Sequence, residues 1–431
     1  MEIKETDNEG LFDPYSLDWD DTIKFPSTRK LKQYGNRIYN RYPARSIFLV
    51  PRATILCNKN INQKLNVLDP FMGSGTTAVE AVNLNCQIYG TEMDPFARLI
   101  AEVSVLKFSI LEKKELLEKY NEIFENWKNQ KPLKKYYPDL KNVEYWFDDL
   151  TFNDLLKLKS HIYENITNEK YLKFFKVTFA DCIKPSSKME RQSTKPYISS
   201  KYAKKIKSVD VSFEYSFKAH LNALSQKNCS SNDLQEIKWA GFDATNFNTI
   251  DNKIHLAITS PPYLSAFDYT QIIKIESSWV GTLVNSDIEQ LRRKQVGHQK
   301  RREQEIDKTV EEIFDPFFKK LLDNPKKSSK TSNINTAKNC LAYFNDIYKN
   351  LKSVKKSLID QGEYHMIIGD NVINGIEIPT HKIIAEIAQK IGFNWSGYYK
   401  YQIKDHRTSI PRNGSGGKIK YEYVIILKND I

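Results

Sequence analysis

The stretch "LNVLDPFMGSGTTAVEAVNLNCQIYGTEMDPFARLIAEVSVL", residues 65–106, contains two strand–helix patterns in succession. "LNVL" predicts a buried strand, a glycine-containing turn follows it, and "TTAVEAVNLN" has the spacing of an amphipathic helix. "CQIYGTEM" predicts the next strand, after which Asp94 and Pro95 are typical of a helix N-cap and of a first helical position. The stretch therefore predicts an α/β fold.

The same alternation resumes in the second half of the chain. "IKWAGFDATNF" and "IHLAITSPPY" predict strands, and the helix "LAYFNDIYKNLKSVKKSLI" precedes a strand at "EYHMIIG". The helix "THKIIAEIAQKI" and two strands, "FNWSGYYKYQI" and "YEYVIILKN", come last. A series of this kind that ends in an antiparallel pair predicts a mixed α/β sheet with one reversed strand.

Two polar segments interrupt this alternation. Residues 107–236 are charged, aromatic and mostly helical in pattern, and they are too many for a connection within a compact sheet. Residues 280–336 form a second, basic helical segment, so we expect two mainly helical insertions in one α/β core. The predicted units are an N-terminal arm at 1–36, core at 37–106, an insertion at 107–236, core with a proline loop at 237–279, an insertion at 280–336 and the C-terminal part of the core at 337–431.

The composition indicates a globular cytoplasmic protein. The chain has 431 residues, of which 40% are hydrophobic, and it has no run long enough to cross a membrane and no signal-peptide pattern. Its five cysteines are scattered without CxxC spacing. We therefore expect a reducing compartment, no structural zinc or other metal site, and no membrane partner.

The net charge of +12 indicates a polyanionic partner, although a generally lysine-rich composition would give the same sign. Residues 184–207 hold eight basic residues and one acidic residue, and residues 292–302 hold six basic residues and no acidic one. Such runs are often only solvated helix faces. Because the two runs flank a proline loop, we expect them to bind phosphates through Lys201, Lys204, Arg292, Arg293, Lys294, Lys300, Arg301 and Arg302.

Three predicted strand ends carry a pattern suited to a nucleoside-bearing cofactor. Gly73 and Gly75 let the backbone turn sharply next to a ligand, but their spacing is that of neither a Walker loop nor a full dinucleotide fingerprint. Glu92, at the end of the next strand, is placed to accept hydrogen bonds from a ribose diol. Asp243 follows the third strand and is placed to accept from an adenine amino group. Each acid alone would equally suit a helix cap or a surface charge.

The loop in "AITSPPYLSAFDY", residues 257–269, is stiff. Pro262 fixes its own φ, lacks an N–H and pushes Pro261 toward an extended conformation. The loop follows a predicted strand, and α/β proteins bind ligands at strand ends. The structural alternative is a rigid proline loop with a packed tyrosine.

"DPFMGSGTT" followed by "TSPPY" resembles the amino-methyltransferases of DNA, which modify cytosine N4 or adenine N6. "RYPARSIFLVPRATIL", "VEYWFDDLTFNDLLKL" and "YEYVIILKN" are similar to further segments of that family. The resemblance covers about residues 37–105, 140–160, 237–282 and 360–430, and it implies a Rossmann-like methyltransferase sheet. The glycine turn precedes the proline loop here, which departs from the common permuted order.

The resemblance implies S-adenosyl-L-methionine as cofactor and double-stranded DNA as substrate, with a restriction endonuclease as a further partner. Residues 37–106 would then be the cofactor-binding half of the core. The implied cofactor-binding residues are Asp69, Phe71, Gly73, Gly75, Thr76, Glu92, Met93, Asp243 and Ala244. The implied catalytic residues are Ser260, Pro261, Pro262 and Tyr263, which would hold a base flipped out of the duplex.

Serine before the two prolines favours cytosine N4 within this family, because aspartate is commoner in the adenine N6 enzymes. An adenine N6 enzyme, an RNA base amino-methyltransferase and a DNA-binding protein with an inactive methyltransferase fold remain alternatives. The sequence ends directly after its last predicted strand. We therefore expect the insertions, residues 107–236 above all, to recognise the target sequence.

Overall fold

A computed structural model of the chain contains one large mixed sheet. The structure describes residues 22–23, 42, 46–59, 64–190, 193, 195–201, 204–225, 236–248, 250, 253–264, 268–298, 303–324, 330–403 and 419–430. Eight described strands lie in the order β1-β9-β10-β6-β5-β2-β3-β4. They are β1 (Thr22–Ile23), β2 (Asn66–Asp69), β3 (Gln87–Thr91), β4 (Lys238–Gly241), β5 (Ile254–Thr259), β6 (Leu358–Gly369), β9 (Phe393–Gln402) and β10 (Tyr421–Asn429).

The predicted sheet with one reversed strand is confirmed. Strand β10 is antiparallel to both of its neighbours, β6 and β9, whereas every other described strand pair in this sheet is parallel. Strand β1, within the predicted N-terminal arm, pairs with β9 and extends the sheet. A separate small hairpin is formed by β7 (Asn371–Ile373) and β8 (Ile376–Ile378).

Helices cover both faces of the sheet because successive strand residues point to opposite sides. Val67 of β2 packs with α2 (Leu49–Asn58), α3 (Thr76–Asn83) and α4 (Pro95–Val105). The next residue, Leu68, packs in the cluster of α11 (Lys308–Leu322), α12 (Lys330–Ser357) and α13 (Thr380–Lys390). Helix α4 begins as the sequence predicts, since the Asp94 side chain accepts hydrogen bonds from two backbone N–H groups of its first turn and Pro95 is its first residue.

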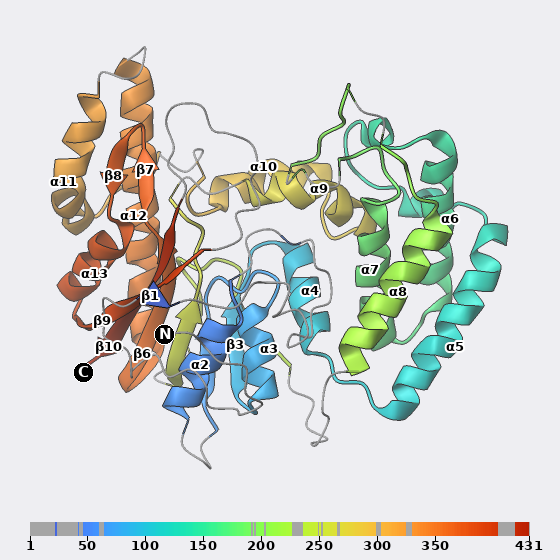
Figure 1. Cartoon of the computed structure of the whole chain (residues 1–431), viewed down its shortest axis with the longest axis horizontal. Helices are drawn as coiled ribbons and strands as arrows, with labels where there is room; N and C mark the ends of the chain where they lie inside the picture. The colour runs from blue at the N-terminus through green and yellow to red at the C-terminus, as the bar shows by residue number, and fades with distance from the viewer. Residues whose placement is uncertain are drawn as a thin grey trace.

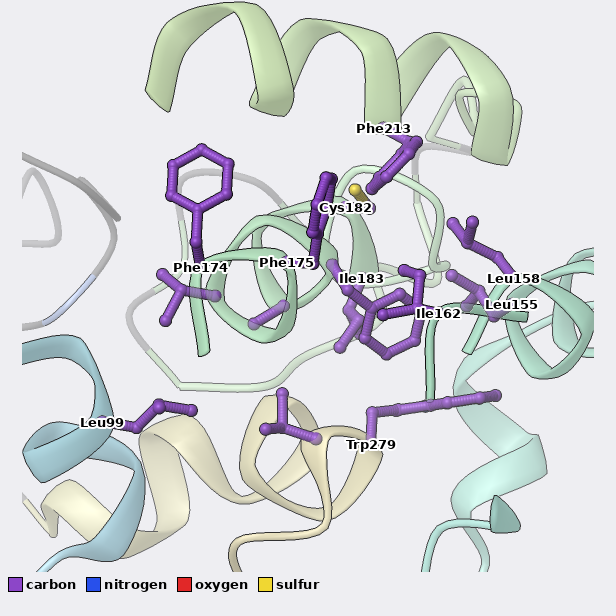
Figure 2. Close-up of a cluster of buried hydrophobic side chains, with 14 of the residues drawn as sticks. Leu99, Leu155, Leu158, Ile162, Phe174, Phe175, Cys182, Ile183, Phe213 and Trp279 are labelled. Atoms are coloured by element: carbon purple, nitrogen blue, oxygen red, sulfur yellow. The ribbon is translucent and has the colours of Figure 1, made fainter. Parts of the chain in front are cut away.

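Four helices of the first polar segment form a bundle beside the sheet: α5 (Ile110–Asn126), α6 (Asp149–Asn165), α7 (Glu169–Ile183) and α8 (Val209–Ser225) (Figure 1). Helix α9 (Tyr269–Val280) runs from the proline loop into this bundle. Figure 2 shows Trp279 of α9 and Leu99 of α4 reaching the same buried cluster as Phe175 and Ile162. The bundle therefore packs directly on the helix that follows the proline loop.

Helix α10 (Asn285–Lys294) begins the second polar segment and lies near α9 above the sheet in the view of Figure 1. Helices α11 and α12 pack against each other on the opposite side of the molecule from the bundle. None of the helices within the described residues is both long and apolar enough to cross a membrane. The division into six units stays a prediction.

Candidate active site

One pocket lies at the ends of β2, β3, β4 and β5, where parallel strands of an α/β sheet place their ligands. Eleven of the sequence-predicted site residues line it: Asp69, Phe71, Gly73, Thr76, Glu92, Met93, Asp243, Ala244, Ser260, Pro262 and Lys294. Strand ends that are far apart in the sequence thus meet at one site. Gly75, Pro261 and Tyr263 do not line this pocket.

The glycine turn is bonded to the acidic end of β3. Gly73 has a φ of +52°, a left-handed conformation that glycine adopts without strain. Its N–H donates to Glu92 Oε2 at 2.8 Å, and the Asp94 N–H donates to Glu92 Oε1 at 2.8 Å. Two ionised carboxylate oxygens offer about four acceptor positions. Glu92 therefore keeps acceptor capacity for a ligand after both backbone bonds are made.

Asp69, at the end of β2, links that strand to the strand carrying the proline loop. Its Oδ1 accepts hydrogen bonds from Thr259 Oγ1 at 2.6 Å and from the Phe71 N–H at 3.0 Å. Burial raises the pKa of Asp69 to about 6, against the opposing effect of these hydrogen bonds. The residue thus lines the pocket and is bonded to the chain segment that leads directly to Ser260.

The pKa of Glu92 is raised to about 7, chiefly by burial and in smaller part by the nearby carboxylates of Asp94 and Asp69. Burial raises the pKa of Asp94 to about 6. Three carboxyl groups therefore share one wall of a pocket in a chain whose net charge is +12. This wall favours a ligand that brings positive charge and hydrogen-bond donors.

The end of β4 supplies an acid and an aromatic ring. Asp243 Oδ1 accepts from the Thr245 N–H at 2.8 Å and from Thr245 Oγ1 at 2.7 Å, which fixes its carboxylate locally. Phe242 lines the pocket with 64% of its surface exposed. The Arg98 guanidinium lies 4.2 Å from the centre of the Phe242 ring, a cation–π contact that holds this ring in place.

The proline loop presents a serine to the pocket. Ser260 and Pro262 line it, and Ser260 Oγ hydrogen-bonds to none of the described residues. Pro261 is buried. Tyr263 is half-buried, and its hydroxyl donates to Glu422 Oε1 of β10. Serine is thus the loop side chain with hydrogen-bonding capacity available to a ligand.

Gly75 lies at a close contact between two helices. Its φ is +84°, and a Cβ at this position would lie 3.0 Å from both Cα and Cβ of Ala101 in α4. Glycine is therefore required here for the turn and for close packing of α3 on α4. A side chain at Gly75 would therefore enter the contact between these two helices.

The predicted phosphate-binding residues fall into three groups. Arg292 Nε lies 2.6 Å from Asp268 Oδ2, and Lys204 Nζ donates to the carbonyl oxygens of Lys184 and Ser187, so both cations serve internal contacts. Lys201, Arg293 and Lys294 are exposed, and Lys294 also lines the pocket. The last group, Lys300, Arg301 and Arg302, lies outside the described residues.

Sequence reasoning did not assign several residues that line the pocket: Tyr42, Ser46, Pro70, Met72, Ser74, Asp94, Phe242, Tyr269, Thr270, Gln295 and Val296. Tyr42 and Ser46 lie within "RYPARS", which the resemblance had already singled out. Tyr269 follows Asp268, the N-cap of α9, and a capping signal of this kind could have placed it at the site. Gln295 and Val296 come from the second polar segment, and no local signal identifies them.

A methylase fold accounts for three features together: the sheet with one reversed strand, the acidic pocket at the strand ends and the serine–proline–proline loop beside it. The profile of the family N6_N4_Mtase, described as DNA methylase, matches residues 14–103. The type II methyltransferase M.MvaI of Kocuria varians is 22% identical over 437 residues, which cover 91% of this chain and 91% of that protein. Residues 14–103 thus resemble the DNA methylases of this family, and most of the chain resembles a type II methyltransferase.

Two further similarities are partial. The type II methyltransferase M.MjaII of Methanocaldococcus jannaschii is 32% identical over 116 residues, so the match spans 27% of this chain and 21% of that protein. The solved structure of TTHA0409 from Thermus thermophilus matches 21% of this chain and 38% of its own at 20% identity, with a TM-score of 0.17. That likeness is too small to bear on the fold. The similarity to DNA methylases favours S-adenosylmethionine as cofactor and DNA as substrate.

Proposed function

We propose that this DNA methylase transfers a methyl group from S-adenosylmethionine to the N4 amine of a cytosine flipped out of double-stranded DNA. The observation that carries the proposal is Ser260. Its hydroxyl lines the pocket, next to strand ends that carry Asp69 and Glu92, and it hydrogen-bonds to none of the described residues. The hydroxyl can therefore accept from an amine brought into the pocket.

The pocket residues fit the proposed cofactor. S-adenosylmethionine carries a sulfonium and an ammonium group, and its ribose offers two hydroxyl donors. Glu92 has the acceptor capacity for the ribose, and the carboxylates of Asp69 and Asp94 favour the positive charges. Phe242, held by Arg98, offers a face for the adenine, beside Asp243. When bound, the cofactor supplies an electrophilic methyl group.

The loop then orients the base. An exocyclic amine is a weak nucleophile because its lone pair is delocalised into the ring. Ser260 Oγ, which lines the pocket, would accept one hydrogen of the amine. The Pro261 carbonyl, which is outside the pocket lining, would have to turn toward the base to accept the other, and the nitrogen lone pair would then be free to attack the methyl group. The same two acceptors stabilise the positive charge that develops on nitrogen before its proton is lost. No covalent bond to the protein is needed.

The first polar segment is our candidate for sequence recognition. Its bundle packs on α9 through Trp279, so its loops are held rigidly relative to the proline loop. Tyr145 and Tyr197 are 63% and 52% exposed, and Lys188 and Trp146 are joined by a backbone hydrogen bond that brings these two loops together. Exposed tyrosines and lysines on a rigid element suit base and phosphate contacts. A chimaera with residues 107–236 of a relative should acquire that relative's target site.

The relatives are type II methyltransferases, and we extend that assignment to this chain as part of the proposal. It would then act in a restriction-modification system beside an endonuclease that recognises the same site. The adenine N6 enzyme is the second candidate, because the family includes both chemistries and the same two acceptors suit either amine.

A methyl-transfer assay tests the proposal. Purified protein is incubated with S-adenosylmethionine labelled on its methyl group and with duplex DNA or structured RNA. We expect label in the duplex alone, and the Ser260→Ala variant should lose it. Label in RNA, or none in either, would contradict the proposed substrate.

A further inference from the structure

The tyrosine of the proline loop is tied to the reversed strand of the sheet. The Tyr263 hydroxyl donates to Glu422 Oε1, and Glu422 is the second residue of β10. The two residues are 159 positions apart in the sequence. A hydrogen bond between two side chains restricts the rotation of both. This contact therefore fixes a tyrosine that would otherwise rotate about two side-chain bonds.

The sheet makes room for the tyrosine ring. Gly369 of β6 lies directly opposite Glu422 of β10 in the strand register. A Cβ on Gly369 would lie 2.8 Å from Cγ2 of Ile419 and 3.2 Å from Cε2 of Tyr263, so the edge of the ring and Ile419 both lie close to the position where a side chain is missing. A second tether holds the next residue of the loop, because Asn371 Nδ2 donates to the Leu264 carbonyl oxygen at 2.9 Å.

Glu422 has no place in the pocket itself, since the pocket lining does not include it. Burial raises its pKa, against the opposing effect of the Tyr263 and Tyr401 hydroxyls that face it. Tyr401 of β9 is its neighbour on the other side in the strand register. A buried carboxyl group is costly unless it is hydrogen-bonded. The hydrogen bond from Tyr263 offsets part of this cost, so the two residues stabilise each other.

We propose that Glu422 is a positioning residue for methyl transfer, which acts by fixing the ring of Tyr263 for contact with the target base. This inference rests on the proposed function. With the hydroxyl on Glu422 and the ring edge over Gly369, the orientation of the ring is set before the base arrives. Because the ring of Tyr263 is already ordered in the free protein, less conformational entropy is lost when the base stacks on it.

The first test compares Glu422→Ala, Glu422→Gln and Tyr263→Phe in the duplex methylation assay. We expect kcat to fall about 10- to 100-fold in Glu422→Ala and in Tyr263→Phe, with cofactor affinity within about 3-fold of wild type. Glu422→Gln keeps an acceptor and should recover most of the loss. The double variant Tyr263→Phe/Glu422→Ala should be no slower than either single variant. The control is Glu377→Gln, which changes an exposed glutamate on β8 and should leave kcat unchanged.

The second test does not depend on activity. Fluorotyrosine is placed at position 263, and its ¹⁹F resonance is recorded in the wild-type and Glu422 backgrounds. We expect one sharp resonance in wild type and in Glu422→Gln, and a shifted, narrower line from a freely rotating ring in Glu422→Ala. The resonance also gives the answer if Glu422→Ala is folded but inactive. If Glu422→Ala is unstable, Tyr263→Phe in the methylation assay still removes the contact and leaves Glu422 in place.

The outcomes separate the two proposals. If wild-type protein transfers no methyl group to duplex DNA, the proposed function fails, and with it the positioning role. If wild type is active, the positioning role is overturned by an unchanged kcat in Glu422→Ala, by additive losses in the double variant, or by a ¹⁹F resonance that does not respond to Glu422→Ala.

Discussion

Two walls of the pocket differ in charge and in what holds them. The wall at the ends of β2 and β3 carries carboxylates that accept hydrogen bonds from backbone N–H groups. The wall formed by the proline loop after β5 is uncharged, and side chains of other strands hydrogen-bond to this loop. Glu92 accepts from the N–H groups of Gly73 and Asp94. Tyr263 of the loop instead depends on Glu422. Two walls of one site are thus built by different means.

The difference shows how one site can separate binding from transfer. Backbone N–H groups are fixed by the fold itself, so the acidic wall is set for one ligand that is the same in every turnover. In the proposed reaction the proline loop has to accept a base that enters from a duplex, and the hydrogen bonds that hold the loop come from β7 and β10. We therefore expect substitutions in the acidic wall to change cofactor affinity and substitutions in the loop to change turnover.

Ser260→Ala should give the largest effect. Removing one of two acceptors for the amine should lower kcat about 100- to 1,000-fold, because charge that develops in the transition state loses its nearest partner. Cofactor affinity, measured by calorimetry, should stay within about 3-fold of wild type. A parallel loss of cofactor affinity would show that the two walls do not act separately.

Glu92→Ala should weaken cofactor binding about 30-fold or more, since hydrogen bonds to a charged group contribute about 1.5–3 kcal/mol each. The variant also leaves the Gly73 and Asp94 N–H groups without their acceptor. Glu92→Gln keeps one acceptor oxygen and should bind with intermediate affinity. Unchanged affinity in folded Glu92→Ala protein would remove Glu92 from the cofactor site.

Cofactor affinity should also depend on pH through Glu92. Burial raises the pKa of this carboxyl to about 7, and its ionised form is the one that accepts from a ribose diol. The dissociation constant should therefore rise as pH falls below about 7, by up to about 10-fold per pH unit. Calorimetry between about pH 5 and 8 should show this dependence in wild type and a flatter one in Glu92→Gln.

The effect on stability has the opposite sign. Because the folded-state pKa of Glu92 is raised from 4.5 to about 7, folding binds a proton in this range. The contribution of this group to the free energy of unfolding is fully present below about pH 4.5 and is lost as pH rises through about 7. Denaturant titrations of wild type and Glu92→Gln across this range measure the difference.

The exposed cations should set the salt dependence of duplex binding. Replacing Lys201, Arg293 and Lys294 by glutamine should reduce the slope of log K against log salt by about 0.9 for each phosphate that the variant no longer neutralises. Lys204→Gln is the matched control, because its Nζ is already held by two backbone carbonyl oxygens and its removal should leave the slope unchanged. Equal slopes for the triple variant and wild type would mean that these residues do not contact DNA.

Local sequence patterns predict the strand ends well. The strands that end at the pocket are apolar and short, and Asp94 with Pro95 marks the start of α4, so the acids at these ends could be assigned to one site. The reversed strand was predictable because two strand-like segments follow one another without a helix between them. The contact of Gly75 with Ala101 could not be predicted, because the sequence does not show that these two residues are neighbours.

Contacts between distant segments could not be predicted. The Tyr263–Glu422 bond joins residues 159 positions apart, and neither residue carries a local signal for the other. Gln295 and Val296 reach the pocket through the packing of α10 on α9, and the same packing brings Arg292 to Asp268. Lys204, a second predicted phosphate-binding residue, is instead held by the carbonyl oxygens of Lys184 and Ser187. A net charge can be counted from a sequence, but the internal partner of each charge depends on the fold.

Nucleoside analysis of DNA modified by this protein tests the central claim most directly. The gene is expressed in a host that lacks DNA methylation, and its DNA is digested to nucleosides and measured by mass spectrometry, with Ser260→Ala as the inactive control. We expect N4-methylcytosine in the wild-type sample and none in the control. N6-methyladenine instead would contradict the choice of base, and the absence of both methylated nucleosides would contradict the proposed transfer to DNA.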